Sequence, residues 1–148
     1  MATQAVKAVF FDLGETLVTK NRKWISGGKD VLSRLHAKSV RLGVISNTGN
    51  LTRAQLLQEL PTDFKFSLFE DALVILSSEV GVAKPSPAIF ELASVRAGLH
   101  PEECLFCTED LLHTLVAQKT GMRAARTLPP ATSDIGTLAQ ALADAGLI

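Results

Sequence analysis

The sequence carries neither an excess of charge of one sign nor a long hydrophobic run. Its 15 basic and 15 acidic side chains cancel over 148 residues, which argues against nucleic acid or an anionic membrane surface as a partner. No apolar stretch is long enough to span a bilayer, and residues 1–7 lack the charged leader and apolar segment of a secretory signal. We therefore expect a cytoplasmic protein that does not enter a membrane.

Cysteine is scarce as well, because the chain has only Cys104 and Cys107 and no second pair. Their C-x-x-C spacing occurs in redox sites and in half of a zinc site. Here the pair lies in an apolar run typical of a β-strand, in which positions i and i+3 point to opposite faces. The two sulfur atoms should diverge, so we expect two buried structural cysteines.

Apolar residues make up 47% and charged residues 20% of the chain, a composition typical of a folded domain. Short apolar runs alternate with segments of helical periodicity. We expect strands at 6–11, 40–45, 73–76, 104–107 and 122–125, and helices from Gly28, at 53–60, 88–97 and 111–119, and from Asp134 to about Gly146. This alternation predicts an α/β fold, a doubly wound, Rossmann-like parallel sheet of about five strands with helices on both faces. No linker rich in Gly, Pro and Ser divides the chain, so we expect a single domain over 1–148.

Two segments are harder to interpret. Residues 19–26 are polar apart from Trp24 and Ile25, and we expect a small hairpin or loop over the end of the first strand. Trp24 would either cover a ligand or close the core, and we favour the core. Residues 62–71 hold three phenylalanines and predict either a short helix or irregular packing that fills the core.

Polar side chains follow the expected strands at the points where the strands end. They are Asp12, then Ser46 and Asn47, then 77–79, then Glu109 and Asp110, with Lys84 in the loop after the third strand. Because the carboxyl ends of parallel strands share one edge of the sheet, and ligands bind at that edge, we expect these residues to meet there.

This combination of side chains suits phosphoryl transfer. A carboxylate can attack phosphorus, as in aspartyl-phosphate enzymes. Hydroxyl and amide donors and a lysine can neutralise the nonbridging phosphate oxygens. Mg²⁺ prefers oxygen ligands and would bridge the phosphate and the carboxylates.

Each of these residues also has a structural interpretation. Asp12 is compatible with a turn or helix cap, the Ser46–Asn47 pair with a helix cap, and Lys84 with a solvated loop lysine. Glu109 and Asp110 would equally suit the first turn of a helix, where carboxylates favour the helix dipole.

Taken in order, the motifs resemble those of the haloacid dehalogenase-like (HAD) superfamily, whose members are mostly magnesium-dependent phosphatases. The resemblance runs from residue 6 to about 122. It implies that Asp12 is the nucleophile, and that Thr16, the first-motif threonine, and Ser46 with Asn47 bind phosphate. It also implies that Lys84 is the third-motif lysine, which binds phosphate and assists catalysis.

The metal ligands follow from the same resemblance. Asp12 and the carbonyl oxygen of Gly14 would bind Mg²⁺. Glu109 takes the place of the fourth-motif aspartate, with Asp110 as a competing ligand and Thr108 in place of the preceding glycine. The motif's second aspartate is replaced by His113 or Thr114, and a histidine is a poor magnesium ligand.

The first motif departs from the family pattern at Gly14, where the phosphatases place a second aspartate. That aspartate protonates the leaving group and later activates water. Loss of a general acid/base costs about 100- to 10,000-fold in rate, or roughly 3–5 kcal/mol of barrier. Substrates with good leaving groups would suffer least.

The segment between Asp12 and Ser46 is too short for a helical cap domain, which resembles the minimal-cap branch of the family. Such members rely on a partner subunit, here a possible homo-oligomer, or on a large substrate to cover the site. The favoured hypothesis is a magnesium-dependent phosphatase acting on a small phosphorylated molecule or a phosphorylated macromolecule. The alternatives are a catalytically degenerate binding or scaffold protein, and a hydrolase that attacks a non-phosphate electrophile through Asp12.

Overall fold

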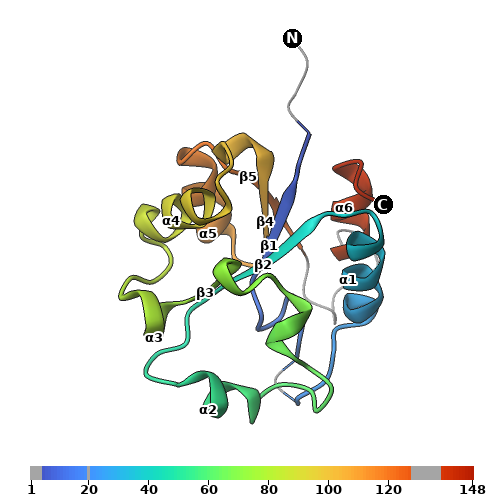
Figure 1. The fold of residues 1–148 in the computed structure, drawn as a ribbon, viewed down its shortest axis with the longest axis vertical. Coiled ribbons are helices and arrows are strands. Elements are labelled where there is room, and N and C mark those ends of the chain that lie inside the picture. Colours follow the sequence, from blue (N-terminus) through green and yellow to red (C-terminus); the bar gives the residue numbers. More distant parts are fainter. Residues whose placement is uncertain (1–4, 20, 128–137) are drawn as a thin grey trace.

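Five parallel strands form one sheet in the computed structural model, which describes residues 5–19, 21–127 and 138–148 (Figure 1). The strands are β1 (Ala8–Phe11), β2 (Arg41–Ser46), β3 (Val74–Leu76), β4 (Cys104–Thr108) and β5 (Arg123–Arg126). Their order is β3-β2-β1-β4-β5, so the chain moves outward from β1 first to one edge and then to the other. This arrangement confirms the doubly wound α/β fold.

Helices cover both faces of the sheet. They are α1 (Gly28–Ala37), α2 (Arg53–Leu57), α3 (Ser77–Val80), α4 (Pro87–Ala97), α5 (Leu111–Lys119) and α6 (Leu138–Asp144). Figure 1 shows α1 and α6 on one side of the sheet and α4 and α5 on the other. No described helix combines the length and the apolar character needed to cross a bilayer.

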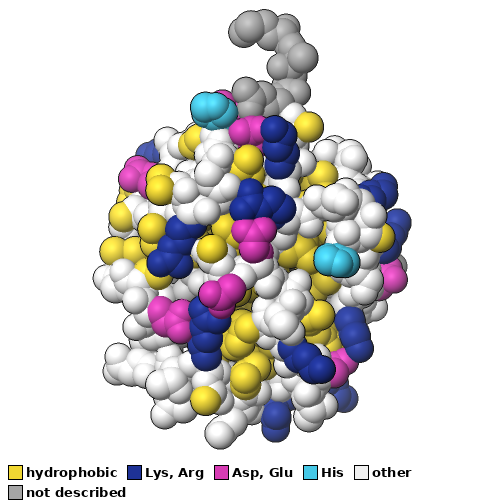
Figure 2. All heavy atoms as spheres, viewed as in Figure 1, with side chains coloured by type: hydrophobic (Ala, Val, Ile, Leu, Met, Phe, Trp, Pro, Cys, Tyr) yellow, Lys and Arg dark blue, Asp and Glu magenta, His cyan; other side chains and the backbone are white. Residues whose placement is uncertain are grey.

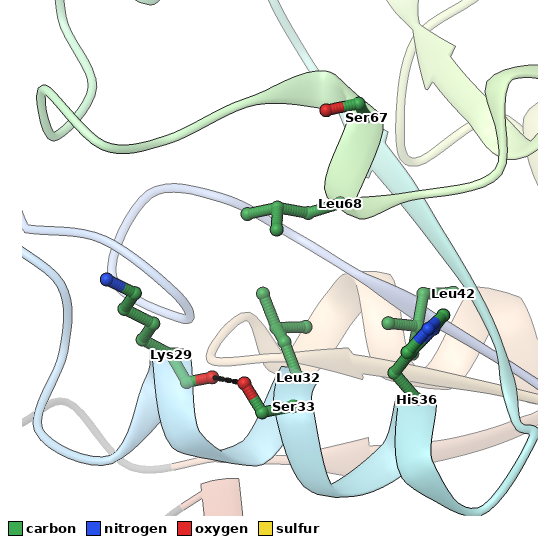
Figure 3. Close-up of a pocket in the computed structure, with 7 residues that line it drawn as sticks. All are labelled: Lys29, Leu32, Ser33, His36, Leu42, Ser67 and Leu68. Atoms are coloured by element: carbon green, nitrogen blue, oxygen red, sulfur yellow. Dashed lines mark hydrogen bonds between the residues drawn. The ribbon is translucent and has the colours of Figure 1, made fainter.

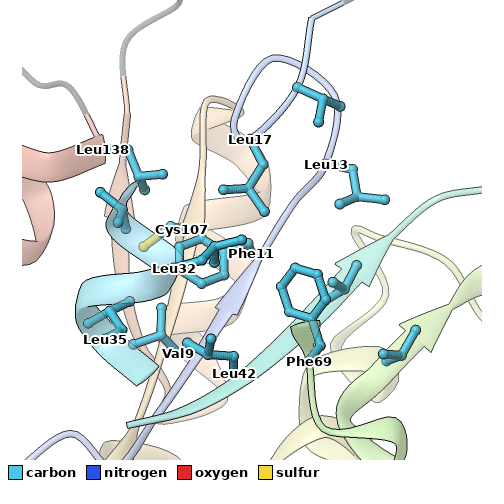
Figure 4. Close-up of a cluster of buried hydrophobic side chains, with 14 of the residues drawn as sticks. Val9, Phe11, Leu13, Leu17, Leu32, Leu35, Leu42, Phe69, Cys107 and Leu138 are labelled. Carbon is cyan, nitrogen blue, oxygen red and sulfur yellow. The ribbon is translucent and has the colours of Figure 1, made fainter. Parts of the chain in front are cut away.

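The central strand β1 supplies both hydrophobic cores because its residues alternate between the two faces. Val9 and Phe11 pack in the cluster with α1 and α6, part of which is drawn in Figure 4. Ala8 and Phe10 pack in the cluster with α4 and α5. All four are fully buried, as expected for a strand of a parallel sheet that is covered on both sides.

The two cysteines lie on opposite faces, as their spacing predicts. Cys104 belongs to the α4 side and Cys107 to the α1 side, and both thiols are free. Burial raises the pKa of Cys104 to about 11 and that of Cys107 to about 12. Such thiols stay protonated near neutral pH, which does not suit redox or zinc chemistry.

Residues 62–71 fill the core without forming an α-helix. The segment contains two short 3₁₀ turns, η1 (Phe66–Leu68) and the start of η2 (Asp71–Leu73). Phe64 and Phe69 are buried in the cluster on the α1 side. Trp24 packs against the same cluster and stacks on Phe64 with ring centroids 5.5 Å apart, as the favoured core interpretation predicts.

Most element boundaries differ from the sequence prediction by one or two residues: β1 begins at Ala8 rather than at residue 6, and β2 and β5 are each shifted by one residue. The helix expected over 53–60 is α only to Leu57, because the N–H groups of residues 58–60 bond carbonyls three residues back and tighten the chain into turns. The third strand begins one residue later than expected because η2 precedes it. The predicted start of the last helix, Asp134, lies outside the described residues.

Charged side chains on the surface alternate in sign. Figure 2 shows basic and acidic side chains interspersed over the face toward the viewer, without a continuous field of either sign. Arg41 pairs with Glu70, and Arg53 pairs with Glu79 and Asp71. The guanidinium of Arg41 lowers the pKa of Glu70.

Candidate active site

Asp12 follows β1 directly, at the carboxyl edge of the sheet. Its Oδ1 accepts from the Leu13 N–H at 2.8 Å and lies 2.9 Å from Lys84 Nζ. Its Oδ2 accepts from the Thr108 hydroxyl at 3.1 Å. The side chain is 13% exposed. The carboxylate is therefore held at both oxygens in a fixed orientation, with one edge open to a ligand.

Lys84 is the cation that balances Asp12. Its side chain is 1% exposed, and Nζ also donates to the Ile45 carbonyl at 3.0 Å. The ammonium lies 5.3 Å from the centroid of the Phe106 ring, within the range of a cation–π contact. Burial lowers the pKa of Lys84, and the Asp12 carboxylate opposes that shift.

Asn47 holds the loop that carries Lys84. Its Nδ2 donates to the Lys84 carbonyl at 2.9 Å, and its Oδ1 accepts from the Lys84 N–H at 2.8 Å. Phosphate binding by Asn47 and by Ser46, which is 6% exposed, stays a prediction. Sequence reasoning missed the pairing with Lys84, which spans 37 positions of the chain.

Ser77 and Ser78, which follow β3, form hydrogen bonds with the loop after β2. The Thr48 N–H donates to Ser77 Oγ at 2.8 Å, and the Thr48 hydroxyl donates to Ser78 Oγ at 2.7 Å. The Ser78 N–H returns a bond to Thr48 Oγ1 at 3.1 Å. These contacts lock two neighbouring strand ends together, so the hydroxyls of the 77–79 run are occupied in binding Thr48.

The turn after Asp12 is open where the family's second aspartate would lie. Gly14 is exposed, and a Cβ built on it meets no atom within 4 Å. Glu15 has a φ of 60°, a left-handed conformation that is uncommon for a residue with a side chain. Thr16 is 1% exposed, and its Oγ1 has no hydrogen-bond partner among the described residues. Phosphate binding by Thr16 stays a prediction.

The loop after β4 gathers negative charge near Asp12. Burial raises the pKa of Glu109, and the neighbouring charges of Asp12 and Asp110 raise it further, against Lys84. Asp110 caps α5 by accepting from the His113 N–H at 3.1 Å. Asp110 is therefore a helix cap, as its structural interpretation predicts. The cap uses only one of its two carboxylate oxygens.

His113 is one of the two residues, with Thr114, that take the place of the fourth motif's second aspartate. Its Nε2 is 3.7 Å from Asp110 Oδ2, and its Nδ1 is buried without a partner among the described residues. Burial lowers the pKa of His113, and the charge of Lys84 adds to that effect. The charges of Asp110 and Asp12 oppose this lowering of the His113 pKa.

The oxygen atoms at this edge of the sheet are of the chemical type that Mg²⁺ binds. Nowhere in residues 5–19, 21–127 and 138–148 do three or more His, Cys, Asp or Glu side chains form a group that could hold a metal ion. Mg²⁺ usually binds through only one or two carboxylates and keeps several waters. Asp12 and Glu109, with the Gly14 carbonyl and Asp110, therefore stay the predicted ligands.

A separate cavity of about 210 Å³ lies between α1 and η1 and contains none of these residues (Figure 3). Leu32, Leu42 and Leu68 form its apolar wall, with Lys29 and His36 beside them. The chemistry inferred for the strand edge therefore does not extend to this cavity.

The chain belongs to the haloacid dehalogenase-like hydrolases, because the model of that family matches residues 2–127. Among curated proteins it resembles mouse acyl-CoA dehydrogenase family member 10, with 28% identity over 102 residues. That match covers 69% of this chain but 9% of the relative, so most of the relative has no counterpart here.

Solved structures share the fold at low sequence identity. A HAD family enzyme from Bacteroides thetaiotaomicron, solved with magnesium and inorganic phosphate, has a TM-score of 0.72 and 18% identity, covering 88% of this chain and 97% of that one. An uncharacterized protein from Corynebacterium glutamicum has a TM-score of 0.70 and 20% identity, covering 97% and 95%. CbbY from Rhodobacter sphaeroides, in complex with xylulose-(1,5)bisphosphate, has a TM-score of 0.68 and 16% identity, covering 92% and 99%.

Proposed function

We propose that this protein is a magnesium-dependent phosphatase that acts through an aspartyl-phosphate intermediate on Asp12. One observation carries the proposal: the Asp12 carboxylate is held at the sheet edge by the buried Lys84 ammonium and the Thr108 hydroxyl. The fixed carboxylate supplies a nucleophile, and the ammonium neutralises charge on the phosphoryl oxygens.

In the first step an Asp12 oxygen forms a bond to phosphorus while the bond from phosphorus to the leaving oxygen breaks. The leaving group departs with the bonding electrons as an oxyanion, because Gly14 supplies no proton. Asp12, Glu109, Asp110 and the Gly14 carbonyl are the groups that would hold Mg²⁺. The ion, when bound, would supply further positive charge to the phosphoryl group.

In the second step water attacks the phosphorus of the aspartyl phosphate, and the bond to Asp12 breaks. Inorganic phosphate leaves, Asp12 is regenerated as a carboxylate, and the proton of the water passes to solvent. In the family's phosphatases an aspartate at the second position after the nucleophile accepts that proton. Here this position is occupied by Gly14, which has no ionisable side chain. Hydrolysis of the intermediate should therefore be slower than its formation from a substrate with a good leaving group.

A rapid-mixing experiment with p-nitrophenyl phosphate and Mg²⁺ tests this scheme. We expect a burst of nitrophenol close to one equivalent per protein, followed by slow turnover. Asp12→Asn should remove both phases, whereas Asp30→Asn, at an exposed position of α1, should leave them unchanged. The absence of both burst and turnover in the metal-loaded protein would overturn the proposal.

A second candidate is a HAD-fold binding protein without turnover. It is favoured by one observation, the exposed Gly14 at the position where the family's phosphatases carry their general acid/base. It predicts no covalent beryllofluoride adduct on Asp12 and weak magnesium binding in calorimetry. Formation of that adduct would count against it. Closure of the site by a second copy of the chain stays a prediction, which sedimentation can check.

A further inference from the structure

A groove of about 510 Å³ lies against the turn that follows the candidate nucleophile; Leu13 and Gly14 line it, whereas Asp12 itself does not. Gly14, the second residue after Asp12, lines one end together with Ser46 and Asn47 at the end of β2. The groove continues toward α2, which lies at the same end of the sheet as the turn after β1 (Figure 1). Its volume is in the range of small-molecule sites. A group leaving from a phosphate at Asp12 would enter this groove.

The walls of the groove are held together by contacts within this chain. On one wall Arg22 donates from Nε to the Leu60 carbonyl at 3.1 Å. Nearby, Trp24 donates from Nε1 to Asp63 Oδ1 at 2.8 Å and stacks on Phe64. These bonds join the segment after β1 to the segment after α2. The groove is therefore formed without a partner subunit.

The lining of the groove is apolar at its base. Val18, Leu56 and Leu60 contribute side chains that are at most 7% exposed. Such a surface favours a flat or compact apolar group over a flexible polar one.

The charges at the groove favour a substrate that carries no anionic group besides the phosphate that is cleaved. Glu15 and Glu59 line it against one cation, Arg22. The Arg22 Nε is already committed to the Leu60 carbonyl, and Glu59 has no ion-pair partner among the described residues. Among the described residues that line the groove, one negative charge is therefore in excess, and it would repel a carboxylate or a second phosphate on the leaving group.

Gly14 adds a chemical restriction at the same place. Without a proton donor there, the leaving oxygen must depart as an anion, which a phenolate (phenol pKa about 10) does far more readily than an aliphatic alkoxide. We propose that the substrate is a small aryl phosphate with an uncharged ring, bound with the ring in this groove. This inference rests on the proposed phosphatase function and narrows its substrate class.

The test is kcat/KM on matched phosphates with Mg²⁺. We expect phenyl phosphate to exceed an alkyl phosphate of similar size by about 100-fold or more, the usual contribution of a general acid. We expect phenyl phosphates with a neutral para-acetyl group to exceed those with a para-carboxylate by about tenfold. Equal rates for aryl and alkyl phosphates, or a preference for the carboxylate that Arg22→Gln removes, would overturn the inference but leave the phosphatase function standing.

The excess charge is tested by a pair of variants. Glu59→Gln should raise kcat/KM for the para-carboxylate substrate several-fold more than it changes that for phenyl phosphate. Glu91→Gln, at an exposed carboxylate on α4, should change neither. If the two variants behave alike, the groove does not receive the ring. If no substrate gives a burst or turnover, the phosphatase proposal itself has failed.

Discussion

Two halves of the candidate site differ in how their side chains are held. The bonded half comprises Asp12, Lys84 and Asn47, which hold one another through bonds of 2.8 to 2.9 Å. The open half comprises Gly14, Glu15, Glu109 and Asp110. There Gly14 has no side chain, Glu15 has a left-handed backbone, and burial together with the charges of Asp12 and Asp110 raises the pKa of Glu109.

The two halves of the site correspond to two parts of the proposed phosphoryl transfer. Under the proposed function the bonded half would carry out the attack on phosphorus, because the proposed nucleophile and its cation are buried and preorganised. The open half would supply proton transfer and metal ligands, and it holds fewer fixed groups. The comparison therefore leads us to expect a protein that forms a covalent intermediate readily and hydrolyses it slowly.

The largest effect should follow from breaking the bonded half with Lys84→Met. The change leaves the Asp12 carboxylate without its cation, and breaking a buried pair in this way costs about 3–5 kcal/mol of stability. Urea unfolding should show this loss, and the nitrophenol burst should disappear. Lys29→Met, which removes a lysine from an exposed pair with Asp63, should barely change either measurement. If both variants lose the same stability, the Asp12–Lys84 pair does not hold the site together.

The open half can instead be completed with Gly14→Asp. The backbone at Gly14 is not left-handed and a Cβ there meets no neighbour within 4 Å, so an aspartate fits without strain. Steady-state kcat should rise about 100-fold, the lower end of general acid/base contributions, and the burst should shrink as hydrolysis accelerates. Gly14→Asn has nearly the same shape without an ionisable group. An equal gain from the asparagine would exclude proton transfer as the cause.

The link between the halves is Thr108, whose hydroxyl donates to Asp12 and accepts from the Asp110 N–H at 3.2 Å. In Thr108→Val the carboxylate loses a bond worth about 1.5–3 kcal/mol. We expect kcat to fall about tenfold, equivalent to about 1.4 kcal/mol, with little change in KM. Thr108→Ser should restore most of the rate, and failure of the serine to do so would indicate a packing role only.

The effect that is absent near neutral pH and appears only in alkali concerns how tightly the sheet beneath the bonded half is packed. The Cys107 carbonyl accepts from the Asp12 N–H at 3.0 Å, and the folded thiol has a pKa of about 12 against an ordinary 9.0. The unfolded chain loses this proton at lower pH than the folded chain does. Stability should therefore be unaffected below pH 9 and fall between pH 9 and 12. Cys107→Ala should flatten that fall in urea titrations, and an unchanged slope would mean that the thiol is not excluded from water.

The fold could be predicted from the sequence because its signals are local. The alternation of short apolar runs with helical periodicity specifies the elements, and the rules for parallel sheets specify their common edge. Asp12 and Lys84 could be placed at that edge for the same reason. The family match over residues 2–127 agrees with the order of the motifs.

The partners of the site residues could not be predicted in this way. Asn47 pairs with the Lys84 backbone and Thr108 donates to Asp12 across 96 positions of the chain. Amide and hydroxyl groups can bind either a ligand or another part of the protein. Which of these occurs depends on distances that are set only when the strand ends are packed together.

The sequence by itself determined the architecture, the edge that carries the chemistry and the glycine at position 14. The tertiary structure decided which polar groups are already occupied by the protein and which are left for a ligand. It also decided that Gly14 opens into a groove between the turn after β1 and α2. The physical reason is that periodicity acts over a few residues, whereas the groove and the Asp12 contacts join segments 38 to 96 positions apart.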